Sequence, residues 1–143
     1  MSGGNSIMIK LIAGVKGTGK TKKLLEQVSS SLQVSNGDVV VIEKGTKLRF
    51  DVSYQARLID TDEYCITDAE SLFGFIAGIV ASNSDVTDIF VDGTLKICAG
   101  DVKAFEALVT KLQGFLAKHD VKIVFTVSMD PEQLSETIKA MAE

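Results

Sequence analysis

Two kinds of hydrophobic pattern alternate along the chain. Short runs that are almost continuously apolar or β-branched are typical of strands covered on both faces, and they lie at residues 7–13, 39–42, 89–91 and 121–127. Weaker strand candidates at 47–50 and 57–59 fall in a polar, turn-rich stretch. The pattern predicts a sheet with an irregular edge region around these two candidates.

Between these runs, apolar residues recur every three or four positions, as they do on one face of a helix. This spacing predicts helices at 20–34, from about 67 to 82, at 102–116 and at 134–142. Thr67-Asp68-Ala69-Glu70 has the spacing of a capping box, and Asp130 before Pro131 is a favourable helix start. The alternation predicts an α/β domain, a three-layer α/β/α arrangement with a mainly parallel sheet.

Length and composition indicate one domain. The chain has 143 residues, of which 45% are hydrophobic, enough for one substantial core and too few to suggest two. Residues 1–6 are small and polar, and we expect them to form a flexible N-terminal extension. Residues 7–143 are then a single domain.

Charge and cysteine content narrow the possible partners. The net charge of −4 and the scattered Lys and Arg residues do not imply nucleic acid. Cys65 and Cys98 stand apart with one histidine, His119, so a zinc site is not expected. Free thiols without a signal peptide indicate the cytoplasm, and the longest apolar run, residues 74–81, is too short to span a membrane.

One sequence motif carries specific chemistry. The pattern G-x-x-x-x-G-K-[ST] is matched at every fixed position by Gly14, Val15, Lys16, Gly17, Thr18, Gly19, Lys20 and Thr21. The motif follows a predicted strand and opens a predicted helix, which is the setting in which backbone N–H groups and the helix N-terminus bind phosphate. Lys20 would contact the β- and γ-phosphates, and Thr21 would complete the coordination of Mg²⁺.

On these residues the chain resembles the P-loop NTPase superfamily, most clearly over residues 7–34, with a core similar to those of recombinases and type II thymidine kinases. The resemblance implies the P-loop NTPase fold and binding of a nucleoside triphosphate with Mg²⁺. ATP is expected because no N/TKxD segment follows a strand. Lys16 is offset by one position from the second lysine of partition-type ATPases, so we interpret it as a surface charge or a charge near the phosphates rather than as their intersubunit finger.

The resemblance also implies an aspartate that ends a buried strand and holds the Mg²⁺. Asp92 has this place after residues 88–91, and Asp60 at the end of a shorter, more polar run is the alternative. In many relatives a glutamate that activates water follows directly, but here that residue is Gly93. Glu43, after residues 39–42, fits the position from which recombinase-like relatives supply it.

Other candidates near the expected site are weaker. Thr126 or Ser128 would sense the γ-phosphate from the last strand, and only Arg49 and Arg57 are available as an arginine finger. Tyr54 fits either base stacking or a partner surface, as does Tyr64.

The sequence therefore leaves the fate of the nucleotide open. A Mg-dependent ATPase with weak hydrolysis is one hypothesis, with Lys20 and Glu43 as its catalytic residues. A nucleotide-dependent switch or adaptor without appreciable turnover is the alternative, motivated by Gly93. A small-molecule kinase ranks below both because the chain lacks the cysteine set of the thymidine kinase lasso. A protein partner or a homo-oligomer stays open.

Overall fold

The computed structural model describes residues 8–143, so the predicted extension and Ile7 lie outside the described part. It contains one five-stranded sheet in which every neighbouring pair of strands is parallel, in the order β1-β5-β4-β2-β3. The strands are β1 (Ile9–Gly14), β2 (Asp38–Glu43), β3 (Arg57–Asp60), β4 (Val86–Val91) and β5 (Lys122–Ser128). The predicted α/β class with a parallel sheet is confirmed.

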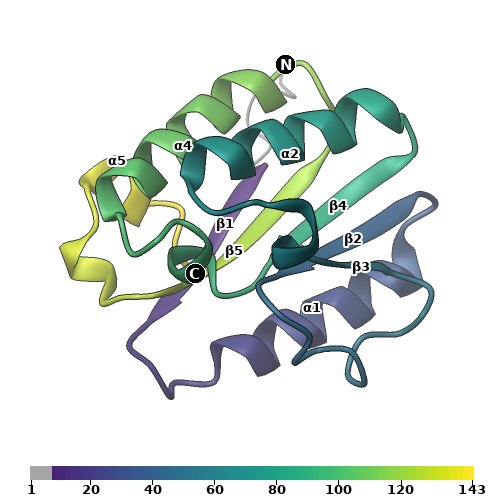
Figure 1. Ribbon diagram of the computed structural model, residues 1–143, viewed down its shortest axis with the longest axis horizontal. Helices are drawn as coiled ribbons and strands as arrows, with labels where there is room; N and C mark the ends of the chain where they lie inside the picture. The colour runs from purple at the N-terminus through teal and green to yellow at the C-terminus, as the bar shows by residue number, and fades with distance from the viewer. Residues whose placement is uncertain (1–7) are drawn as a thin grey trace.

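Helices cover both faces of the sheet (Figure 1). Helix α1 (Lys20–Val34) lies on one face, and α2 (Ala69–Ser82) and α4 (Val102–Leu116) lie on the other. The strand order explains this division. The connection from β1 to β2 runs in one direction across the sheet, while those from β3 to β4 and from β4 to β5 run in the opposite direction. Right-handed crossovers in opposite directions place their helices on opposite faces.

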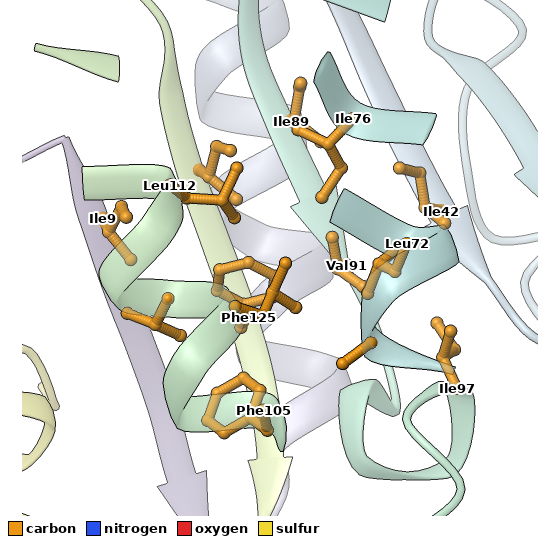
Figure 2. Packing of buried hydrophobic residues seen from close by; sticks show 14 of the residues in the cluster. Ile9, Ile42, Leu72, Ile76, Ile89, Val91, Ile97, Phe105, Leu112 and Phe125 are labelled. Carbon is orange, nitrogen blue, oxygen red and sulfur yellow. The ribbon is translucent and has the colours of Figure 1, made fainter. Parts of the chain in front are cut away.

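Each face of the sheet has its own hydrophobic cluster. The larger one joins the sheet to α2 and α4, and Figure 2 shows Phe105 of α4 against Phe125 of β5. These rings meet edge to face with their centroids 5.8 Å apart, a favourable aromatic geometry. The smaller cluster lies under α1 and includes Leu24, Val28 and Phe90.

The connection from β2 to β3, residues 44–56, is irregular. The predicted strand at 47–50 is wrong, because the amides of Asp51 and Val52 both donate to the carbonyl of Leu48 and close the segment into turns. The side chains of Leu48 and Ala56 are buried in the cluster under α1. The short β3 that follows is an edge strand, as expected for this region.

Several predicted helix boundaries need correction. Asp68, rather than Thr67, caps α2 and forms its capping box with Ser71. The helix predicted at 134–142 is wrong in extent: a 3₁₀ turn, η3 (Pro131–Gln133), precedes a short α5 (Glu136–Lys139). The chain then runs beside β1, where Leu11 N–H donates to Met141 O and Leu11 O accepts from Glu143 N–H. Two short elements were not predicted, η2 (Thr61–Tyr64) and α3 (Thr94–Ile97).

Candidate functional site

A cavity of about 380 Å³ opens at the carboxyl edge of the sheet. Because the strands are parallel, their carboxyl ends and the loops that follow them meet at this edge, where ligands of open α/β sheets bind. The lining residues come from the loop before α1 and the first turn of α1, from the ends of β2, β4 and β5, from the β2–β3 connection, and from α3 with the residues before it. They are Lys16, Gly17, Gly19, Lys20, Thr21, Lys22, Glu43, Lys44, Lys47, Leu48, Asp92, Gly93, Lys96, Thr126 and Ser128.

The loop that joins β1 to α1 requires its glycines. Gly17 and Gly19 have φ values of 87° and 81°, in the left-handed region that other residues seldom adopt. At Gly14, a Cβ atom would lie 2.6 Å from Thr18 Oγ1. That hydroxyl donates to the carbonyl of Val15 at 2.8 Å. The three glycines of the motif therefore let the loop fold tightly over itself before α1 begins.

The N-terminus of α1 differs from those of the other long helices. The side chains of Asp68 and Asp101 cap α2 and α4, whereas in residues 8–143 no side-chain hydrogen bond caps α1, whose N-cap is Gly19. The first turn of α1 also holds no acidic residue. Its leading amides and the positive end of the helix dipole therefore remain available to an anion.

Basic side chains surround the cavity. Lys20 is 9% exposed, and its Nζ donates to the carbonyl of Val15 at 3.0 Å, across the loop. The lining contains six lysines, Lys16, Lys20, Lys22, Lys44, Lys47 and Lys96, and two carboxylates, Glu43 and Asp92. This local excess of positive charge, in a chain of net charge −4, favours an anionic ligand at this edge.

Asp92 is held against the loop by hydroxyl groups. Thr21 Oγ1 donates to its two carboxylate oxygens at 3.2 and 3.3 Å. Thr126 Oγ1 donates to Asp92 Oδ1 at 2.7 Å and accepts from Gly93 N–H at 2.8 Å. The carboxylate is thereby fixed beside the first turn of α1.

The donor set of Thr21 and Asp92 fits Mg²⁺. This cation is usually bound in proteins by one or two carboxylates together with phosphate oxygens and water. Residues 8–143 hold no group of three or more His, Cys, Asp or Glu side chains able to cage a metal. One carboxylate and one hydroxyl beside a helix N-terminus suit a cation that arrives with a phosphate.

Asp60 lies away from this group. Its Oδ1 accepts from Gly45 N–H at 2.8 Å and from Asp62 N–H at 2.9 Å. These bonds close the start of η2 against the β2–β3 connection. The structure thus separates the two aspartates: Asp92 contacts Thr21, and Asp60 stabilises a turn.

Glu43 lines the cavity, but its carboxylate also accepts a hydrogen bond from the backbone of the β2–β3 connection. Its side chain is 3% exposed, and Oε2 accepts from Leu48 N–H at 2.9 Å. Burial raises the pKa of Glu43 above its ordinary value; the hydrogen bond from Leu48 opposes this shift and the negative charge of Asp92 adds to it. One of its two oxygens is therefore occupied by a backbone contact.

The remaining candidates divide into two groups. Lys16 and Ser128 line the cavity, and Ser128 lies directly beside Gly14 in the register of β5 and β1. Thr126 also lines it, but its hydroxyl is engaged by Asp92 and Gly93. Arg49 and Arg57 are not among the described residues that line the cavity. The Arg49 guanidinium is 5.0 Å from the centre of the Phe50 ring.

Sequence reasoning missed Lys22, Lys44, Lys47 and Lys96 as residues of the site. Lys44 and Lys47 follow the end of β2, and Lys96 lies on α3 just after Asp92. Lys22 directly follows Thr21 in the first turn of α1. For the other three, the only signal was their place after strands that end at the same edge, and that signal depends on the order of the strands.

Comparison with known proteins gives no assignment: no family model and no curated protein matches the chain. Within residues 8–143, no helix combines the length and apolar character needed to cross a membrane. The geometry of the cavity must therefore carry the functional assignment.

Proposed function

We propose that the protein binds a nucleoside triphosphate, ATP, together with Mg²⁺ in this cavity, as a P-loop NTPase would. The observation that carries the proposal is the contact between the Thr21 hydroxyl and the Asp92 carboxylate at 3.2 Å, beside the uncapped N-terminus of α1. A strand-to-helix turn with only a structural role has no need for a carboxylate at this point. A cation shared with a phosphate explains it.

Each part of the cavity has a role in binding. The amides of the loop and of the first turn of α1 would receive the phosphate oxygens. Lys20 would exchange the carbonyl of Val15 for the β- and γ-phosphates, a favourable exchange because a charged acceptor replaces a neutral one. Thr21 and Asp92 would hold Mg²⁺, and Thr126 would keep the Asp92 carboxylate in orientation. The other lysines of the lining would offset the remaining phosphate charge.

We expect hydrolysis to be slow. A group that orients the attacking water must have a free oxygen near the γ-phosphate. Gly93 follows Asp92, and one carboxylate oxygen of Glu43 accepts from Leu48 N–H while burial favours the neutral form of this side chain. These contacts also favour the second candidate, a switch that changes state on binding and turns over negligibly.

The test of binding is thermal unfolding with Mg-ATP, Mg-ADP and Mg-GTP. Ligand at about 100 times its Kd adds about 2.7 kcal/mol to the free energy of unfolding. We expect this gain in the wild type and in Lys103→Ala, an exposed lysine of α4 that serves as the matched control. Lys20→Ala should lose it. Equal shifts in Lys20→Ala and the control would refute the assignment of the site.

Phosphate release separates the two candidates. Slow release that Lys20→Ala abolishes and Glu43→Gln reduces would support an ATPase in which Glu43 acts on water. Nucleotide binding without release above the Lys20→Ala background would support the switch, and a partner retained in one nucleotide state only would complete that case.

A further inference from the structure

The β2–β3 connection presents two aromatic rings to solvent. Phe50 is 88% exposed and Tyr54 is 94% exposed, whereas large aromatic side chains ordinarily gain stability by burial. The other six phenylalanines are all buried or partly buried. Tyr64, the other tyrosine, is 49% exposed and stacks on Phe75. Phe50 and Tyr54 therefore stand out as rings that the fold itself does not use.

The segment that carries these two rings is rich in basic residues. Residues 44–57 contain four basic side chains, Lys44, Lys47, Arg49 and Arg57, and one acidic side chain, Asp51. The Arg49 guanidinium lies 5.0 Å from the centre of the Phe50 ring, within the range of a cation–π contact. Lys44 pairs with Asp62 at 2.7 Å and Lys47 lines the cavity, which leaves Arg49 and Arg57 as the positive charges of this surface outside the cavity. The segment is thus basic within a chain that is acidic as a whole.

The segment is anchored from beneath. Leu48 is 3% exposed and packs in the cluster under α1, and Glu43 accepts from its amide. Turn hydrogen bonds from Asp51 and Val52 return to its carbonyl. The rings therefore project from a backbone whose path is already fixed, which lowers the entropy cost of ordering them around a ligand.

We propose that the surface formed by residues 44–57 binds single-stranded nucleic acid. Exposed rings stack on unpaired bases, and neighbouring Lys and Arg side chains contact the phosphates, which is the combination that sequence-tolerant single-strand binding requires. Two other ligands fit this surface less well. In a duplex the phosphates are accessible but the bases are stacked on one another, and an acidic protein surface has negative charge but no series of aromatic rings on which Phe50 and Tyr54 could stack. From the net charge of the whole chain, nucleic acid was not an expected partner. The proposal differs from that expectation because a net charge does not show where basic residues gather locally.

The test is fluorescence anisotropy with a labelled oligothymidylate of about 20 nucleotides, long enough to cover a typical site. We expect binding to the wild type that weakens as salt increases, because phosphate contacts release counterions. Phe50→Ala with Tyr54→Ala should weaken binding about tenfold or more, since the stacking contacts of both rings with the bases are lost. Both side chains are exposed, so the double variant should keep the wild-type free energy of unfolding.

Three controls make the result specific. Tyr64→Ala removes a tyrosine outside the surface and should bind the oligonucleotide as the wild type does. Lys20→Ala should also retain binding, which excludes entry of the oligonucleotide's phosphates into the cavity and keeps this test independent of the proposed nucleotide. The double variant should keep the Mg-ATP stabilisation of the wild type.

Phe50→Trp gives a direct signal, because the chain contains no tryptophan. We expect this variant to retain binding and its fluorescence to be quenched as bases stack on the ring. Wild-type affinity in the double variant, or loss of binding in Lys20→Ala, would overturn the proposal. So would equal affinity for duplex DNA, or binding of poly-glutamate with no binding of the oligonucleotide, which would indicate an acidic protein partner instead.

Discussion

Two connections cross the face of the sheet covered by α1, and they are stabilised in different ways. The connection from β1 to β2 begins with the loop at 14–19, whose neighbours Thr21, Asp92 and Thr126 are joined by hydroxyl–carboxylate hydrogen bonds. The connection from β2 to β3 depends on Leu48, which is buried, and on the bond from its amide to Glu43. Polar contacts thus define the first connection and a hydrophobic anchor defines the second. A fixed polar geometry suits recognition of one small anion, whereas an anchored but exposed turn suits a larger and less specific partner.

Leu48→Ala tests the anchor and should have the largest effect on stability. Removal of a buried leucine side chain costs about 2–5 kcal/mol, because transfer energy is lost and a cavity remains. Phe50→Ala, two residues away, should change the free energy of unfolding by no more than about 0.5 kcal/mol, because that ring is exposed. Urea denaturation of both variants measures the difference. Similar losses in both would mean that the connection does not depend on a single anchor.

Asp92→Asn and Asp60→Asn test the polar geometry as a matched pair. With Mg-ATP at about 100 times its Kd, the wild type should gain about 2.7 kcal/mol. In the wild type, part of this gain depends on Mg²⁺ and is lost when EDTA removes the metal. Asp92→Asn should lack that Mg-dependent part, because the amide binds Mg²⁺ poorly. In Asp60→Asn the amide oxygen still accepts from Gly45 N–H and Asp62 N–H, so the gain should persist. The reverse result would assign the metal to Asp60.

The same contrast explains what the sequence predicted. The helix at 20–34 was predicted with the bounds that the structure has, because its apolar spacing and its glycine loop are both local signals. Residues 47–50 alternate as a strand would, but the contacts of Leu48 with Glu43 and with α1 turn Phe50 outward. The last helix ends early because residues 141–143 make backbone contacts with Leu11, a distant partner.

One part of the candidate site could be predicted from local sequence, and another part depends on how the strands are ordered. The loop from Gly14 to Thr21 is recognisable because its chemistry depends on spacing along the chain. The contact between Thr21 and Asp92, and the contribution of Lys96, depend on the order β1-β5-β4 across the sheet. Strand order follows from crossovers and core packing, which no local pattern in the sequence encodes.

Thr126→Val tests how Asp92 is positioned, with a smaller expected effect. The substitution keeps the shape of a side chain that is 2% exposed and leaves Gly93 N–H and Asp92 Oδ1 without this hydroxyl. The expected cost is about 1–3 kcal/mol, with a weaker Mg-dependent gain in nucleotide binding. Thr94→Val is the control, because that buried hydroxyl makes only a 3.4 Å bond to the carbonyl of Val91. Equal effects on Mg-dependent binding in the two variants would show that Thr126 does not orient Asp92.

Glu43→Gln tests the link between the two connections and should have the smallest effect. The amide oxygen still accepts from Leu48 N–H, so the anchor is preserved, but the buried negative charge beside Asp92 is removed. Because the pKa of Glu43 is raised in the folded state, its protonated form is favoured there, and the stability that this provides is lost as the pH rises from about 4.5 through the folded-state value. The variant should therefore be more stable than the wild type at neutral pH, and the difference should vanish near pH 4. Thermal unfolding across this range measures it. A variant that is less stable than the wild type at neutral pH would show that the fold stabilises the Glu43 carboxylate in its charged form, and a difference that does not change with pH would show that its pKa is not raised.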